Sequence, residues 1–202
     1  MHAFPRFRPY GSTSFYGSAT LRAVQKSSRW VFGYGSLVWR PAFAYEDRAA
    51  GYVRGFARRF WQGSPDHRGA PAEPGRVVTL VRDECATCWG VAYQVAESEW
   101  ESVLRALDDR ESGGFERHDV EVRFEEPGRS PVGALVYVAG EGNPNFLGPA
   151  SLDEMAAQVR RARGKSGTNA DYVERLAVAL RQLGADDDHV FALAAALAAS
   201  LA

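Results

Sequence analysis

The sequence predicts an α+β fold in which strands come first and helices fill the C-terminal third. Apart from one helical segment, residues 30–138 consist of short apolar runs of strand length separated by glycine, proline and charged residues. From residue 151 onward, apolar side chains recur at the three- and four-residue spacing of helices. Because strands and helices do not alternate along the chain, a doubly wound parallel sheet is not expected.

The composition is that of one globular domain without a general affinity for nucleic acid or membranes. The 202-residue chain is 46% hydrophobic and 24% charged, and its formal net charge is -1. No apolar run approaches the roughly 18 residues of a membrane span, and no signal-peptide core is present. We therefore expect a cytoplasmic protein. The sequence predicts no particular oligomeric state.

Residues 1–29 differ in composition from the rest of the chain. They contain arginine, lysine and many serines but no acidic residue, and the first carboxylate of the chain is that of Glu46. Such a composition is typical of a transit peptide. The plainer interpretation is a disordered N-terminal extension, and we expect a single folded domain over residues 30–202.

The first half of this domain is predicted to consist of strands and one long loop. Residues 30–38 predict a strand that runs into a glycine-containing loop, and the aromatic run 56–61 predicts a second strand. Residues 63–75 contain three prolines and form a loop long enough to suggest a function. Two further apolar runs, 77–81 and 89–95, predict a hairpin.

A lone Cys-x-x-Cys pair lies between the two runs of the predicted hairpin. A structural zinc site needs four ligands, and no second cysteine pair or matching histidine pair follows Cys85 and Cys88. A thioredoxin-type pair begins a helix, which these flanking runs do not predict. We therefore interpret the pair as part of a turn, with no metal bound.

The remaining elements follow from apolar spacing and capping residues. Residues 97–110 predict an amphipathic helix, and residues 115–124 and 132–138 predict strands. Ser151 and Glu154 fit a capping box that opens a helix ending near residue 163.

Two more helices are predicted at the C-terminus. Asn169 is placed to cap the first of them, which Gly184 ends. An alanine-rich helix starts near Asp187.

The glycine-containing loop is the first candidate binding site. Two glycines close together allow backbone conformations closed to other residues and leave amide groups free to bind an oxyanion or a carboxylate. An ordinary tight turn would have the same glycines, and the triplet Tyr-Gly-Ser also occurs at residues 10 and 16 without a strand before it. The candidate residues are Gly33, Tyr34, Gly35, Ser36, Leu37 and Val38.

Glu111 is the candidate general base. The apolar stripe of the 97–110 helix, extended by four residues from Leu107, reaches this glutamate. Burial raises the pKa of a carboxyl group toward the range of a base that acts near neutral pH. A glutamate turned to solvent at a helix end is the alternative, and Glu116 and His118 in the next strand are competing candidates.

The other histidines and the known catalytic motifs offer weaker signals. His67 lies in the long loop, where it can hold the loop by a hydrogen bond, and His189 follows an acidic run and is expected in solvent. The chain contains no His-Glu-x-x-His motif, no nucleophile elbow and no P-loop.

With these residues in view, the chain resembles the ChaC family of glutathione-specific γ-glutamylcyclotransferases. The segment 30–39 resembles the opening strand and the Tyr-Gly-Ser-Leu substrate loop of the family, and Arg110-Glu111-Ser112-Gly113-Gly114-Phe115 resembles its glutamate segment. Further matches occur at residues 58–69, 74–80, 143–144, 147–149 and 166–169. The resemblance spans roughly residues 30–195 in one unbroken order.

The resemblance implies a small mixed β-barrel with flanking helices, no cofactor, and glutathione as the substrate. It implies that Glu111 is the catalytic acid and base, and that Gly33 to Val38 bind the substrate. Tyr137 on the last strand is a candidate hydrogen-bond donor to the substrate, although it fits a core position equally well. Two alternatives stay open: cyclotransfer on other γ-glutamyl peptides or amines, and a protein that binds γ-glutamyl compounds without catalysis.

Overall fold

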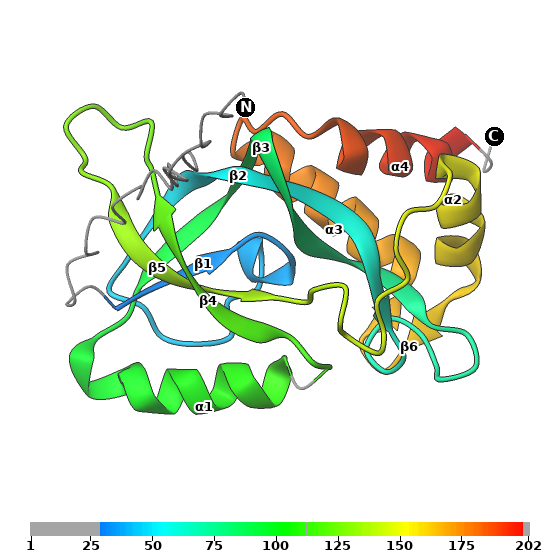
Figure 1. The fold of residues 1–202 in the computed structure, drawn as a ribbon, viewed down its shortest axis with the longest axis horizontal. Helices are drawn as coiled ribbons and strands as arrows, with labels where there is room; N and C mark the ends of the chain where they lie inside the picture. The colour runs from blue at the N-terminus through cyan, green and yellow to red at the C-terminus, as the bar shows by residue number, and fades with distance from the viewer. Residues whose placement is uncertain (1–28, 112, 200–202) are drawn as a thin grey trace, which may run out of the picture.

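The computed structural model describes residues 29–111 and 113–199, which form a bent sheet with helices on both sides (Figure 1). The predicted N-terminal extension lies, except for Arg29, outside the described residues. Helix α1 (Trp100–Arg110) covers one side of the sheet. Helices α2 (Leu152–Arg161), α3 (Asn169–Gln182) and α4 (Asp188–Ala199) pack together on the other.

The five-stranded sheet has the order β2-β3-β1-β5-β4. Its strands are β1 (Trp30–Gly33), β2 (Asp47–Ser64), β3 (Gly75–Gln94), β4 (Glu116–Val122) and β5 (Val132–Val138). Strand β1 pairs in parallel with β5 and antiparallel with β3, so the sheet is mixed.

The sheet is not the closed barrel that the resemblance implied. Its edge strands β2 and β4 approach each other but share only an isolated bridge between Tyr52 and Arg123. The two edges come this close because residue 51 is a glycine: a methyl group there would lie 2.7 Å from Cγ1 of Val122. A continuous ladder between the edges is not formed, and the sheet stays open.

The predicted hairpin around the cysteine pair is wrong, because residues 75–94 form the single strand β3. Strand β2 accompanies β3 along its whole length, in register from Asp47 opposite Gln94 to Ser64 opposite Gly75. At the bend, Gly55 has a φ of +79° and lies opposite residues 83–86, which form a bulge. Within this bent strand Cys85 is exposed and Cys88 is buried, and both are free thiols.

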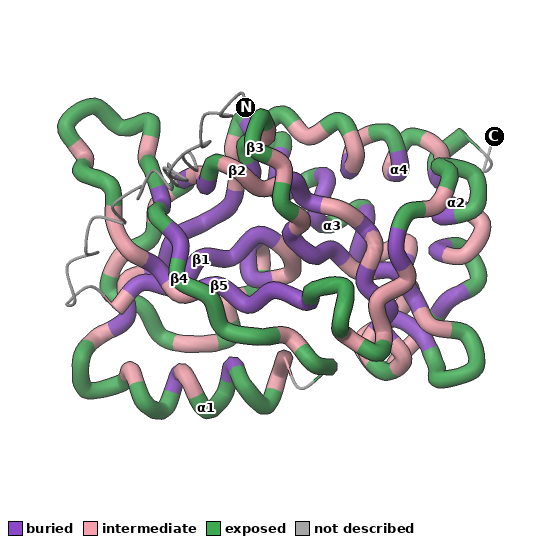
Figure 2. Tube along the Cα trace, in the orientation of Figure 1, coloured by how far each residue is buried: buried purple, intermediate pink, exposed green. Residues whose placement is uncertain are grey.

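Two apolar clusters hold the layers together. Buried positions run along the central strands β1 and β5 (Figure 2). Side chains alternate across a strand, so Phe32 of β1 enters the large cluster beneath α2, α3 and α4, whereas Val31 enters a smaller one beneath α1. Val103 and Leu107 of α1 complete the smaller cluster, which confirms the predicted amphipathic helix.

The observed capping residue matches the prediction at α2 and differs from it at α3. Ser151 and Glu154 form the predicted capping box, and α2 ends at Arg161. At α3 the capping residue is Thr168. Asn169 is instead fully buried, where it accepts a hydrogen bond from the Arg76 amide (2.6 Å) and donates one to the Arg76 carbonyl (2.7 Å). The pairing of the Asn169 side chain with the backbone of a distant strand cannot be predicted from the residues next to it in the sequence.

The prediction that His189 is solvated is wrong. Its Nε2 accepts a hydrogen bond from the Phe60 amide (3.0 Å), its ring stacks on that of Phe60, and burial lowers its pKa to about 4. Next to it, the buried Arg58 guanidinium pairs with Asp187 at 2.8 Å. These contacts fix the start of α4 against β2. Within the described residues, no helix is long and apolar enough to cross a membrane.

Candidate functional site

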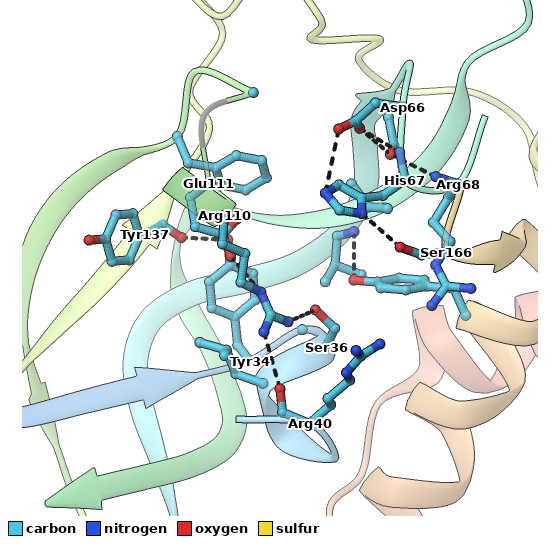
Figure 3. Close-up of a pocket in the computed structure, with 18 of the residues that line it drawn as sticks. Tyr34, Ser36, Arg40, Asp66, His67, Arg68, Arg110, Glu111, Tyr137 and Ser166 are labelled. Carbon is cyan, nitrogen blue, oxygen red and sulfur yellow. Dashed lines mark hydrogen bonds and ion pairs between the residues drawn. The ribbon is translucent and has the colours of Figure 1, made fainter. Parts of the chain in front are cut away.

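A pocket of about 370 Å³ opens where the end of β1, the end of α1 and the loop after β2 meet (Figure 3). The predicted residues Gly35, Ser36 and Glu111 line it, as do Asp66 and His67 of the long loop. The topology thus brings together three segments that are far apart in the sequence.

The glycine-containing loop forms one wall of the pocket and turns into the short 3-10 helix η1 (Ser36–Val38). Gly33 is required because a methyl group there would lie 2.5 Å from Cβ of Leu37. The amides of Val38, Trp39 and Arg40 bond to loop carbonyls within this turn. The amides of Gly35 and Ser36 have no acceptor within residues 29–111 and 113–199, so they are free to bind an anion.

Glu111 lies at the C-cap of α1, at the edge of the same pocket. Its side chain is 19% exposed, and its carboxylate is 3.3 Å from Nε of Arg110. Burial raises the pKa of Glu111, Arg110 opposes this shift, and the negative charge of Asp66 adds to it. A carboxyl group with a raised pKa and an opening to the pocket is suited to accept and return a proton.

Arg110 connects the glutamate to the glycine-containing loop. Its guanidinium donates to the Ser36 hydroxyl (2.7 Å) and to the Arg40 carbonyl (3.2 Å) while its Nε faces Glu111. Figure 3 shows this side chain spanning the gap between the two segments. The spacing of Glu111 and the loop therefore depends on a contact that the apolar stripe did not predict.

The two glycines after Glu111 are held by Asn143. The Asn143 amide donates to the carbonyls of Gly113 (2.9 Å) and Gly114 (2.7 Å), and its oxygen accepts from the buried Gln62 amide (3.1 Å). Gly114 has a φ of +86°, a conformation that favours glycine. This clamp fixes the chain directly after the glutamate.

Two predicted tyrosines meet on the inner side of the pocket. The Tyr34 hydroxyl donates to the Tyr137 carbonyl (2.7 Å), and burial, followed by the charge of Glu111, raises the pKa of Tyr34 well above its usual range. The Tyr137 phenol instead points away from Glu111 (Figure 3) and donates to Asp108 at 2.7 Å. Tyr137 lines the pocket, and the donation of its hydroxyl to the substrate stays a prediction.

The competing candidates do not line the pocket. Glu116 and His118 lie on β4 with side chains 80% and 51% exposed, and their nearest ionic contact is with each other at 3.9 Å. Of the carboxylates that the sequence left open, only Glu111 lines the pocket.

The opposite wall is formed by the long loop after β2. His67 Nδ1 is 2.7 Å from the Ser166 hydroxyl, which belongs to the turn between the short strands β6 (Arg163–Gly164) and β7 (Gly167–Thr168). Asp66 pairs with Lys165 at 3.1 Å. The prediction that His67 holds the loop by a hydrogen bond is confirmed. Burial lowers the pKa of His67, which favours its neutral form.

Sequence reasoning missed three arginines that line the pocket. Arg40 follows η1, Arg68 belongs to the long loop and Arg175 lies on α3. Their separation in sequence hid the cluster, and only the arginine-rich composition of the chain hinted at it. Within the described residues, no group of three or more His, Cys, Asp or Glu side chains is arranged to hold a metal ion.

Comparison with known proteins places this geometry in a family. A ChaC family model, described as ChaC-like protein, matches residues 29–200. The chain belongs to the ChaC family. The family that the loop and the glutamate segment resembled is thereby confirmed, and the match begins where the described structure begins.

Two glutathione-specific γ-glutamylcyclotransferases are similar to this chain over most of its length. Glutathione-specific gamma-glutamylcyclotransferase 1 of Danio rerio is 45% identical over 180 residues, which cover 87% of this chain and 92% of that protein. The glutathione-specific gamma-glutamylcyclotransferase of Schizosaccharomyces pombe is 38% identical over 187 residues, 84% of this chain and 92% of its own.

Solved structures of γ-glutamylcyclotransferases share the fold of this chain. A yeast γ-glutamylcyclotransferase specific to glutathione superimposes with a TM-score of 0.78 at 31% identity, covering 86% of this chain and 97% of its own. A more distant γ-glutamyl cyclotransferase, 17% identical, superimposes with a TM-score of 0.52 over 83% of this chain and 86% of its own, and shares the fold.

Proposed function

We propose that this chain is a glutathione-specific γ-glutamylcyclotransferase, which converts glutathione into 5-oxoproline and cysteinylglycine. The observation that carries the proposal is the Glu111 carboxylate, largely buried and with a raised pKa, at the edge of a pocket whose other wall offers free backbone amides. The names of the ChaC relatives from Danio rerio and Schizosaccharomyces pombe support the choice of substrate.

The reaction needs no nucleophile from the protein. The α-amine of the γ-glutamyl group attacks its own γ-carbonyl carbon, a five-membered ring closes, and the bond to the cysteine nitrogen breaks. No water is consumed. Well-oriented intramolecular attack reaches effective molarities of about 10⁵–10⁸ M, so folding the substrate into the ring-closing conformation supplies much of the acceleration.

Glu111 handles the proton in both halves of the reaction. At neutral pH the α-amine is mostly protonated and must first lose one proton to solvent; as the free amine attacks, the ionised Glu111 carboxylate accepts the further proton that this nitrogen gives up on forming the lactam. The same carboxyl group then returns the proton to the departing cysteine nitrogen, which leaves as a neutral amine. The raised pKa of Glu111 suits both steps, since a carboxyl group whose pKa lies closer to neutral pH can both accept a proton and donate it.

The loop from Gly33 to Val38 binds the γ-glutamyl end. The free amides of Gly35 and Ser36 bind the α-carboxylate or the oxyanion that develops on the γ-carbonyl oxygen. Donors fixed by the turn need no reorganisation as charge develops, so they favour the transition state.

The decisive experiment incubates the purified protein with glutathione and follows 5-oxoproline and cysteinylglycine by mass spectrometry. Glu111→Gln keeps the shape and removes the base, so turnover should fall below a few per cent of wild type while glutathione binding, measured by calorimetry, persists. Glu116→Gln is the matched control, because this exposed glutamate does not line the pocket. Higher residual activity in Glu111→Gln would refute the role of Glu111.

The same assay separates the alternatives. Equal turnover of γ-glutamyl-alanine and glutathione would indicate a cyclotransferase for γ-glutamyl compounds in general. Binding of glutathione by wild-type protein without either product would indicate a binding protein. We expect product from glutathione, because a binding site alone has no use for a partly buried carboxylate beside the ligand.

A further inference from the structure

We propose that Arg40, Arg68 and Arg175 form a subsite for the glycine carboxylate of glutathione, and that this subsite sets the preference for the tripeptide. The inference rests on the proposed function and adds the residues that read the end of the substrate that does not react.

The three guanidinium groups come from separate segments and line one pocket. In Figure 3, Arg68 lies across the pocket from Glu111. Arg40 lies at the bottom of the view, next to the glycine-containing loop. Arg68 is largely buried, with a side chain that is 10% exposed, whereas Arg40 and Arg175 lie at the rim. A ligand that enters between the rim arginines would therefore meet Arg68 at the inner end.

Positive charge at this end of the pocket exceeds the negative charge that faces it. Asp171 is the nearest carboxylate, and it lies 4.0 Å from Arg68 and 3.3 Å from Arg175. Among the described residues, the Arg40 guanidinium has neither an ion pair nor a hydrogen bond. Burial lowers the pKa of Arg68, Tyr172 and Asp171 oppose this shift, and the nearby Arg175 and Arg40 add to it.

The other carboxylates of the pocket are already engaged. Glu111 faces Arg110, and Asp66 faces Lys165 and His67. An incoming anion is therefore the partner that would balance the three arginines. Arginine is suited to this task, because its planar fork binds a carboxylate through two parallel hydrogen bonds.

Arg68 is held in place by contacts that leave part of its guanidinium open. Nη1 donates to the Thr168 carbonyl at 3.1 Å, and the guanidinium lies over the Tyr172 ring at 5.4 Å. These contacts fix the plane of the group without neutralising its charge. An arginine oriented in advance loses little entropy when a carboxylate binds.

Glutathione has a carboxylate at each end, and the proposed chemistry fixes one of them. With the γ-glutamyl group at the loop beside Glu111, the cysteine and glycine residues extend away for up to about 7 Å. The glycine carboxylate then lies toward the wall that contains Arg68. A γ-glutamyl compound without this second carboxylate lacks the partner for the arginines.

The test compares three substrates: glutathione, γ-glutamylcysteine, and glutathione whose glycine carboxyl is converted to an amide. For wild-type protein, kcat/KM should fall by about 10- to 100-fold on the amide, which has no terminal carboxylate, mainly through KM, because the lost hydrogen bonds involve charged groups. It should also fall on γ-glutamylcysteine, whose terminal carboxylate lies one residue nearer the reacting carbonyl and does not reach the arginines. 5-Oxoproline is common to all three reactions, so one readout serves for all.

Replacing each of the three arginines in turn tests which of them bind the glycine carboxylate. Arg40→Gln should reduce kcat/KM on glutathione by about 10-fold and leave it nearly unchanged on the amide. Arg68→Gln and Arg175→Gln should follow the same pattern. Arg105→Gln is the matched control, since this arginine is exposed on α1 and does not line the pocket. Thermal unfolding checks the fold of the Arg68 variant, and Arg40→Gln repeats the test at an exposed position.

The outcomes separate this inference from the function on which it rests. Equal kcat/KM for glutathione and its amide, or an equal loss on both in Arg40→Gln, overturns the subsite and leaves the cyclotransferase intact. Absence of 5-oxoproline from every substrate overturns the proposed function and the subsite with it. A loss confined to glutathione in Arg40→Gln supports both.

Discussion

Replacing Gly33 by alanine tests whether the shape of the loop, and not only its composition, makes the site. The added methyl group would lie 2.5 Å from Cβ of Leu37. Carbon atoms in contact normally lie about 3.5–4.0 Å apart, so the loop must move by about 1 Å. Leu37 cannot retreat easily, because it is buried in the cluster beneath α1 with Val31 and Leu107.

The expected cost in stability is moderate, and the expected cost in activity is large. Inserting a methyl group into a packed site costs about 1–3 kcal/mol. A domain with about 5–15 kcal/mol of stability stays folded after such a loss. A displacement of about 1 Å in a catalytic arrangement can reduce the rate about 100-fold. We therefore expect Gly33→Ala to be folded and to retain about one per cent of wild-type kcat/KM on glutathione.

The assay combines 5-oxoproline formation with urea denaturation on the same preparation. Gly140→Ala is the matched control, because a methyl group there meets nothing within 4 Å and the residue is exposed. The control should keep its activity and change the free energy of unfolding by less than about 0.5 kcal/mol. A stable Gly33→Ala protein with full activity would refute the argument that the tight loop positions the substrate.

Three further results are expected. Asn143→Ala removes two hydrogen bonds to the glycines after Glu111 and should lower kcat at least 10-fold and stability by about 1–3 kcal/mol, with Asn145→Ala as the control in parallel assays. His189 has a pKa lowered to about 4 from 6.5, so its contribution to stability is present above pH 6.5 and is lost as pH falls toward 4. His189→Gln should flatten the pH dependence of the melting temperature over that interval. The pKa of Glu111 is raised in the folded state, so ionisation opposes folding; Glu111→Gln should melt higher than wild type at pH 7, and the difference should vanish in acid.

The sequence predicted the features that depend on local spacing. The stripe of α1 placed Glu111 at a partly buried helix end, and the capping box at Ser151 set the start of α2. Both follow from contacts within a few residues, which periodicity and capping rules describe. The same rules could not choose between a hairpin and one bent strand at residues 75–94, because the partner that keeps β3 continuous is the distant β2.

The rest of the site arises from contacts between distant segments. Asn143 meets the glycines after Glu111, and Arg175 meets Arg68, only because the sheet and α3 bring them together. An isolated asparagine or arginine shows no pattern along the chain. Tyr137 shows the same limit: the sequence predicted its strand position, but not the hydrogen bond of its hydroxyl to Asp108 on the neighbouring helix.

Arg110 joins the loop and the base into one unit, which gives the Gly33 variant a second readout. The guanidinium donates to the Ser36 hydroxyl while it lowers the pKa of Glu111, against the larger effect of burial. A loop displaced by the new methyl group would pull Arg110 away, and the pKa of Glu111 would rise further. Since the ionised carboxylate is the base, the acid limb of the kcat/KM profile should move to higher pH in Gly33→Ala. An unchanged acid limb with reduced kcat/KM would mean that the loop and Glu111 act independently.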